Sequence, residues 1–91
     1  MSTKVVRSVD FLPQFCEDLI YWIKTDRKIA LRTMELVEAV VADPFHGIGK
    51  PEPLRYEFAG AWSRRITQEH RLICRVSGNR VDFLMARFHY D

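Results

Sequence analysis

Residues 43–76 have the sequence DPFHGIGKPEPLRYEFAGAWSRRITQEHRLICRV, and this stretch decides the fold. Three prolines and two glycines fall within 44–53, which excludes a helix or strand there and restricts the backbone of the loop. After the loop, apolar and polar residues alternate as they do in β-strands. Basic side chains with aromatic residues between them are typical of an anion-binding surface. The basic residues of the stretch are Lys50, Arg55, Arg64, Arg65, Arg71 and Arg75.

A meander of four strands is predicted from residue 54 onward. Apolar residues alternate with polar ones in these segments, and short polar or glycine-containing turns separate them. If neighbouring strands pair in order, Arg65 and Arg71 lie opposite each other across a tight hairpin. The predicted strands are 54–58, 62–67, 70–76 and 81–89.

The N-terminal half of the chain predicts a short strand at 5–6 followed by two helices. Asp10 is placed to cap the first helix, and Pro13 falls in its first turn. An apolar stripe at helical spacing continues to about Lys24. Asp26 can cap the second helix, whose apolar residues recur every three or four positions. Two such helices form an antiparallel hairpin with an apolar surface to bury.

These elements predict the fold class. With 91 residues, of which 47% are hydrophobic, the chain can bury one modest core. We expect a single α+β domain spanning 1–91. In it the N-terminal strand is followed by a two-helix hairpin that packs on one face of a mostly antiparallel twisted sheet.

The formal net charge of +2 hides an uneven distribution of charge. Residues 1–43 carry six Lys/Arg and seven Asp/Glu, whereas residues 44–91 carry eight and five. Seven of those eight bases are arginine, whose planar guanidinium fits phosphate, so we expect a phosphate-bearing partner. Cys16 and Cys74 lack zinc-site spacing and are predicted to be buried thiols in a reducing compartment. No apolar run is long enough to span a membrane, so we expect a cytoplasmic protein.

Glu52, His89 and the arginines have the chemistry for RNA cleavage without a metal ion or other cofactor. The 2′-hydroxyl must lose a proton to attack the phosphorus, the leaving 5′-oxygen must gain one, and the added negative charge must be neutralised. A carboxylate or imidazole can act as the base, an imidazole as the acid, and arginine can hold the phosphate. The same composition also fits a module that binds RNA without cutting it.

Four strings of residues resemble the Txe/YoeB family of bacterial toxins, which belongs to the RelE-like superfamily. They are GKPEPL at 49–54, WSRRIT at 62–67, EHRL at 69–72 and RFHY at 87–90. The resemblance covers nearly the whole chain. It implies a RelE-like fold, which is similar to that of the microbial RNases.

The resemblance implies an endoribonuclease that cuts mRNA in the ribosomal A site. By its position in the motifs, Glu52 resembles the general base and His89 the general acid. Arg65 and Arg71 resemble the arginines that stabilise the phosphate during catalysis. Tyr90 resembles the residue that orients the RNA and the imidazole.

The resemblance also implies further contacts and partners. Lys50, Arg55 and Arg64 join Arg65 as expected RNA or phosphate contacts, although Arg55 stands where the family commonly has lysine. A cognate YefM/Phd-like antitoxin is expected to cover the basic site, and a homodimer is a further candidate assembly. Asp91 follows the final motif as an extra charged residue.

Two alternative functions remain open at this point. One is a ParE-like toxin on the same scaffold that inhibits a protein such as gyrase without cutting RNA. The other is an RNA-binding module whose arginines grip phosphate, which predicts strongly salt-dependent binding and no cleavage products.

Overall fold

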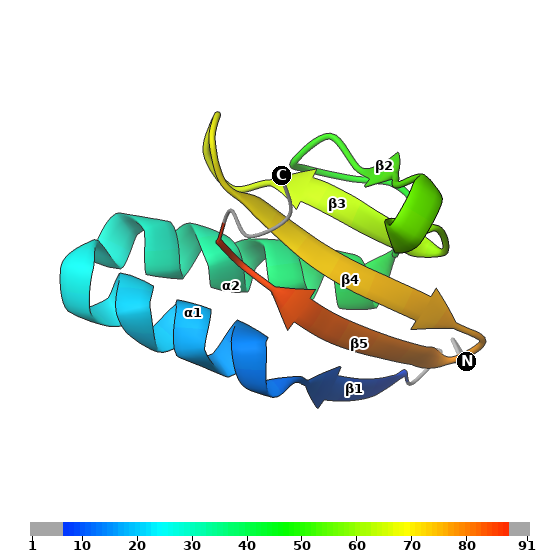
Figure 1. Cartoon of the computed structure of the whole chain (residues 1–91), viewed down its shortest axis with the longest axis horizontal. Helices are drawn as coiled ribbons and strands as arrows, with labels where there is room; N and C mark the ends of the chain where they lie inside the picture. The colour runs from blue at the N-terminus through cyan, green and yellow to red at the C-terminus, as the bar shows by residue number, and fades with distance from the viewer. Residues whose placement is uncertain (1–6, 88–91) are drawn as a thin grey trace, which may run out of the picture.

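The structure is a computed structural model, and it describes residues 7–87. Two helices follow a short first strand, and the remaining strands come after them along the chain (Figure 1). The helices and strands are β1 (Ser8–Phe11), α1 (Pro13–Thr25), α2 (Arg27–Ala42), β2 (Glu52–Pro53), a 3-10 turn (Tyr56–Phe58), β3 (Ala61–Arg65), β4 (Arg71–Ser77) and β5 (Arg80–Met85). Neither helix has the length and apolar character that crossing a bilayer requires, in the part of the chain described.

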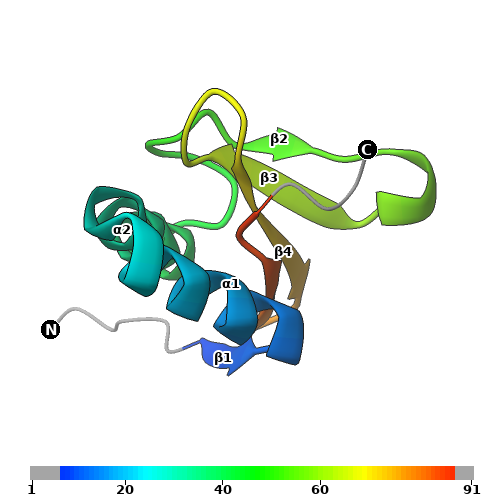
Figure 2. The ribbon, with the colours of Figure 1, turned by 60° about the vertical axis from the view of Figure 1, so that its left-hand side comes forward.

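The five strands form one sheet in the order β1-β5-β4-β3-β2. β1 pairs with β5 in parallel, and all other neighbours pair antiparallel. Both helices lie on the same face of this sheet (Figure 2). The predicted α+β fold is therefore confirmed, including the antiparallel order of β3, β4 and β5 and the hairpin that sets Arg65 opposite Arg71, but the first strand of the predicted meander differs.

The core lies between the helices and the sheet face that they cover. Helix α2 contributes aliphatic side chains at helical spacing, and β4 and β5 contribute alternate residues, as expected where one side of each element is buried. The fully or nearly fully buried members of this cluster are Phe15, Leu36, Val37, Val40, Ile66, Leu72, Cys74, Val81, Phe83 and Ala86. The opposite face of the sheet carries no helix (Figure 2).

The N-terminal elements differ from the prediction in position. The strand is Ser8–Phe11, and residues 5–6, where it was expected, lie outside the described part. Asp10 belongs to this strand and does not cap α1, so that prediction is wrong. Its carboxylate instead contacts Arg80 Nη2 at 2.6 Å, which ties β1 to β5. Pro13 does occupy the first turn of α1, as predicted.

The cap of the second helix is confirmed. Asp26 Oδ1 accepts hydrogen bonds from the backbone N–H groups of Lys28, at 3.2 Å, and Ile29, at 3.4 Å. These are two of the donors that a helix N-terminus leaves without intrahelical partners.

Residues 54–58 do not form the strand that their alternation predicted. The strand there is limited to Glu52–Pro53, and the chain then makes a 3-10 turn in which Phe58 N–H donates to the Arg55 carbonyl at 3.2 Å. Tyr56 has φ +59°, outside the range of extended backbone, and its side chain is 90% exposed. Pro51 and Pro53 also lack the N–H donors that a longer ladder would need.

The two cysteines have different environments, so the prediction of two buried thiols is half right. Cys74 on β4 is buried, whereas Cys16 is exposed because it lies next to, and not on, the buried face of α1. Burial raises the pKa of the Cys74 thiol to about 11. Cys74 is therefore a protonated, inert thiol near neutral pH.

This difference gives two expected results. A thiol-alkylating reagent at pH 8 should label one cysteine in the folded protein, and replacement of Cys16 by alanine should abolish that fast reaction.

Between pH 9 and 11 the unfolded chain releases its Cys74 proton first, so the free energy of unfolding should fall by up to about 1.4 kcal/mol per pH unit. Urea unfolding of wild type and Cys74→Ala across this range measures the difference; identical slopes would contradict the assignment.

Candidate active site

The sheet face that carries no helix brings Glu52 and two arginines together. Directly opposed residues of antiparallel strands share a face, and the register pairs Glu52 with Ser63, Ser63 with Ile73, and Arg65 with Arg71. These positions alternate with the buried β4 residues that pack against α2, so their side chains lie on the opposite side. Arg65 is the diagonal neighbour of Glu52, a spacing of about 7–8 Å between Cα atoms.

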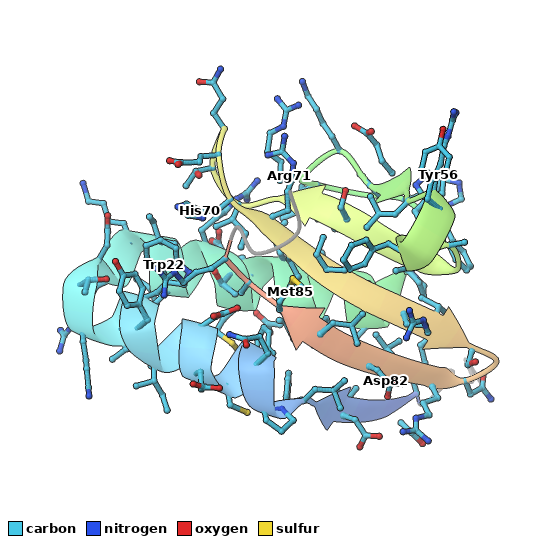
Figure 3. The ribbon with its side chains drawn as sticks, viewed as in Figure 1. Trp22, Tyr56, His70, Arg71, Asp82 and Met85 are labelled. Carbon is cyan, nitrogen blue, oxygen red and sulfur yellow. The ribbon has the colours of Figure 1, made fainter. Side chains whose placement is uncertain are left out.

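The opposed pair Arg65 and Arg71 is the main electrostatic feature of this face. Like charges directly across a strand pair are destabilising. The cost is tolerable where an anion can bind between them, because guanidinium groups are suited to phosphate. Figure 3 shows Arg71 at the end of the sheet beside the β3–β4 turn.

The β3–β4 turn fixes one side of the Arg71 guanidinium. Nη1 of Arg71 donates to the Thr67 carbonyl at 2.9 Å and to the Gln68 carbonyl at 3.0 Å. The Thr67 hydroxyl oxygen in turn accepts from the His70 N–H at 3.0 Å, so the turn is itself braced. Within residues 7–87, Nε and Nη2 of Arg71 donate no hydrogen bond, so no group in that part of the chain is bonded to them.

Glu52 lies in the loop between two prolines and is exposed. The loop is held close to the protein by the Arg65 N–H, which donates to the Gly49 carbonyl at 2.6 Å. A side chain at Gly49 would place its Cβ 2.6 Å from Leu36 Cδ2, so the buried Leu36 side chain would have to shift to admit it. Gly49 also has φ +84°, which glycine adopts readily. The position of Glu52 therefore depends on the backbone two to three residues before it.

Arg64 is not brought to this face, although it was predicted to contact RNA. It is 1% exposed and lies under the loop, where it donates to three backbone carbonyls. Nη2 contacts the Asp43 oxygen at 2.6 Å and the His46 oxygen at 3.0 Å, and Nη1 contacts the Ile48 oxygen at 3.1 Å. Desolvation lowers the pKa of the Arg64 guanidinium, an effect that Cys74 and Asp43 oppose. The geometry makes Arg64 the anchor of the loop.

Lys50 and Arg55 are both exposed but lie in different places. Lys50 is beside Arg65, since both line one pocket between the loop and α2. Arg55 follows Leu54, whose N–H donates to the Ala61 carbonyl at the opposite end of β3. Four residues of strand, about 13 Å, separate that end from Arg65. Figure 3 shows the neighbouring Tyr56 beside the 3-10 turn, at the other end of β3 from Arg71.

Helix α1 holds the chain where it leaves β5, which the sequence alone did not indicate. Asp18 is buried, and its Oδ2 accepts the Ala86 N–H at 2.8 Å. The Trp22 indole N–H donates to the Ala86 carbonyl at 2.9 Å, and its ring lies 4.7 Å from that of His70. The Arg87 guanidinium lies 3.7 Å from the Tyr21 ring centroid. The sequence did contain one sign of this contact: Asp18 is an acidic residue that lies between two residues of the apolar stripe of α1.

His89 and Tyr90, expected as acid and orienting residue, lie outside the described residues. No group of three His, Cys, Asp or Glu side chains within residues 7–87 is arranged to hold a metal ion. The described part of the site is thus one carboxylate with the Arg65–Arg71 pair beside it.

Comparison with known proteins identifies the family. The family model described as the YoeB-like toxin of bacterial type II toxin-antitoxin systems matches residues 11–90. Toxin YoeB from Mycobacterium bovis is 51% identical over 85 residues, which cover 93% of this chain and 100% of that protein. Fold and sequence therefore agree on a class, the toxins of bacterial type II toxin–antitoxin systems. The chain belongs to the YoeB-like family of that class.

Solved structures agree with this assignment. The YoeB/ParE toxin from Agrobacterium tumefaciens has a TM-score of 0.84 at 39% identity and covers 91% of this chain and 99% of its own. The YoeB dimer from Staphylococcus aureus has a TM-score of 0.83 at 35% identity, with 93% and 99% covered. The YoeB-YefM complex from the same organism gives 0.82 at 34% identity, with 92% and 98% covered.

Proposed function

We propose that this toxin is a ribosome-dependent endoribonuclease that cuts mRNA in the ribosomal A site. The observation that carries the proposal is the position of Glu52 on the sheet face that carries no helix, diagonal to Arg65 and its partner Arg71. A carboxylate beside two guanidinium groups supplies a proton acceptor and a binding site for negative charge, the two requirements for attack by a 2′-hydroxyl.

In the proposed reaction, Glu52 removes the proton of the 2′-hydroxyl, whose oxygen then attacks the adjacent phosphorus. Arg65 and Arg71 neutralise the charge that develops on the phosphorane oxygens. His89 donates a proton to the departing 5′-oxygen, and Tyr90 orients the imidazole and the RNA. The products are a 2′,3′-cyclic phosphate and a 5′-hydroxyl. Because Glu52, His89 and the two arginines supply the base, the acid and the positive charge, the proposed reaction needs no metal ion.

His89 is within reach of this site by chain length. It follows Ala86 by three residues, which can span at most about 11 Å. Met85 pairs with Ile73, two residues from Arg71 on the neighbouring strand. The α1 contacts to Ala86 thus fix the point from which the last residues of the motif depart.

Partners follow from the same family. The YoeB-YefM complex supports a YefM-like antitoxin for this chain, and the YoeB dimer supports a homodimer. A basic site exposed in the cytoplasm would cleave cellular mRNA unless covered, so an acidic antitoxin segment is expected to bind it. Such a segment can be disordered before it binds.

The test is to map 5′ ends on an mRNA translated in a purified system with the wild-type protein. We expect cuts within the A-site codon, cyclic phosphate and 5′-hydroxyl ends, and no cuts when ribosomes are omitted. Intact mRNA together with inhibition of gyrase would instead support the ParE-like alternative. RNA binding without product would support the binding module.

A further inference from the structure

A shallow basic pocket is lined by residues of α2, of the loop between α2 and β2, and of β3 and the β3–β4 turn. Its volume is about 300 Å³. None of its lining residues is acidic. They are Arg32, Gly49, Lys50, Arg65, Ile66, Thr67 and Gln68.

Three cations reach this pocket from three separate elements. Arg32 comes from α2, Lys50 from the loop and Arg65 from the end of β3. Arg32 Nη1 lies 3.6 Å from Glu35 Oε1, an ion pair between partly exposed side chains. Such a pair is worth little in water, so it neutralises Arg32 only weakly. The pocket is therefore positive and can accept an anion.

The backbone around the pocket is held in a restricted conformation. Lys50 has φ +51°, in the left-handed region that side chains rarely adopt. It is held there between Gly49, where an added Cβ would crowd Leu36, and Pro51. The Arg65 N–H bond to the Gly49 carbonyl, at 2.6 Å, joins the loop to β3. Strain retained in this way is common at binding sites.

Arg65 connects the pocket to the candidate active site. It lines the pocket and is also the direct cross-strand partner of Arg71. An RNA strand with its scissile phosphate at Arg71 can therefore extend past Arg65 toward Lys50 and Arg32. Thr67 and Gln68 add polar side chains that can donate to phosphate oxygens.

We propose that this pocket binds a second, unreacted phosphodiester of RNA, and that Arg32 is the residue that distinguishes this subsite from the cleavage centre. The inference rests on the proposed function for its substrate class. Its ligand is a backbone phosphate, which either the mRNA or the ribosomal RNA can supply. Arg32 positions RNA and takes no part in proton transfer.

The experiment compares Arg32→Gln with Arg27→Gln, an equal loss of charge on the same helix outside the pocket. Binding is measured at two salt concentrations to a short single-stranded RNA with 2′-O-methyl riboses and to ribosomes without mRNA. We expect Arg32→Gln alone to weaken binding about tenfold and to reduce the log–log salt slope by about 0.7–0.9. Arg32→Lys should restore most of the affinity.

The two binding arms identify the source of the phosphate. A loss confined to the oligonucleotide assigns the pocket to mRNA, and a loss confined to empty ribosomes assigns it to ribosomal RNA. For Arg32→Gln, only the affinity should change: at saturating protein its single-turnover cleavage rate should stay within twofold of wild type, because Arg32 takes no part in proton transfer. Equal affinities for Arg32→Gln and Arg27→Gln would overturn the inference and leave the proposed function standing. If the wild-type protein never cleaves mRNA but Arg32→Gln still weakens RNA binding, only the proposed function is overturned.

Discussion

Replacement of Glu52 by glutamine is expected to slow mRNA cleavage on the ribosome by about 10²–10⁴-fold, the usual contribution of a general base. Glutamine keeps the size of the side chain and its place between Pro51 and Pro53 but cannot accept the proton of the 2′-hydroxyl. Arg65 and Arg71 are untouched, so ribosome binding should be retained. The measurement is the single-turnover rate on programmed ribosomes, together with the affinity of the same variant.

The control for this prediction is Glu38→Gln, which removes an exposed carboxylate from α2. It should cleave at the wild-type rate, because Glu38 lies in the helical layer and not on the sheet face that carries Glu52. Cleavage by Glu52→Gln at the rate of Glu38→Gln would remove Glu52 from the mechanism. If Glu52→Gln cleaves at the wild-type rate but binds programmed ribosomes more weakly, Glu52 is a binding residue.

Arg64→Met is expected to lower the free energy of unfolding by about 3 kcal/mol. Methionine can fill much of the buried volume, but it leaves the carbonyls of Asp43, His46 and Ile48 without the charged donor that now joins them. Hydrogen bonds to a charged group contribute about 1.5–3 kcal/mol each, and the removal of a buried cation offsets part of their loss. Urea unfolding monitored by tryptophan fluorescence measures the change.

Two further variants separate the causes. Arg64→Lys keeps the charge but not the planar fork, so its stability should fall between those of wild type and Arg64→Met. Arg75→Met changes an exposed arginine on the next strand and should cost less than about 0.5 kcal/mol. If Arg64→Met unfolds at the same urea concentration as Arg75→Met, then Arg64 does not hold the loop.

The positions of Arg64 and Arg65 illustrate how much of the candidate site could be predicted from the sequence. Alternation placed the two on opposite faces, and Arg64 shares its row with Trp62 and Ile66, so a buried position was indicated by its neighbours. Arg64 was nevertheless predicted to contact RNA, because residues 43–76 contain so many basic side chains. Which carbonyls receive the guanidinium depends on the path of the loop, which is set by contacts with α2 and β3 that are distant in sequence.

Local signals predicted the rest of the fold unevenly. The β3–β4 hairpin followed from alternation around a polar turn, so Arg65 and Arg71 were paired correctly. The segment 54–58 also alternated, but two prolines and the left-handed Tyr56 replaced its expected strand by a turn. Asp10 had a plausible cap position, yet parallel pairing with β5 placed it in a strand beside Arg80. Pairing partners this distant in sequence leave no local pattern.

The hold that α1 exerts on Ala86 has a consequence for the order of assembly. Asp18 and Trp22 bond to a residue 68 and 64 positions later in the chain, and β1 pairs with β5 across a similar distance. Contacts of such long range form late, because closing the intervening chain costs entropy before any contact is gained. The bonds from Asp18 and Trp22 to Ala86 can therefore form only after residue 86 has been added to the chain. The point from which residues 87–90 depart is therefore fixed only when nearly all of the toxin has been synthesised.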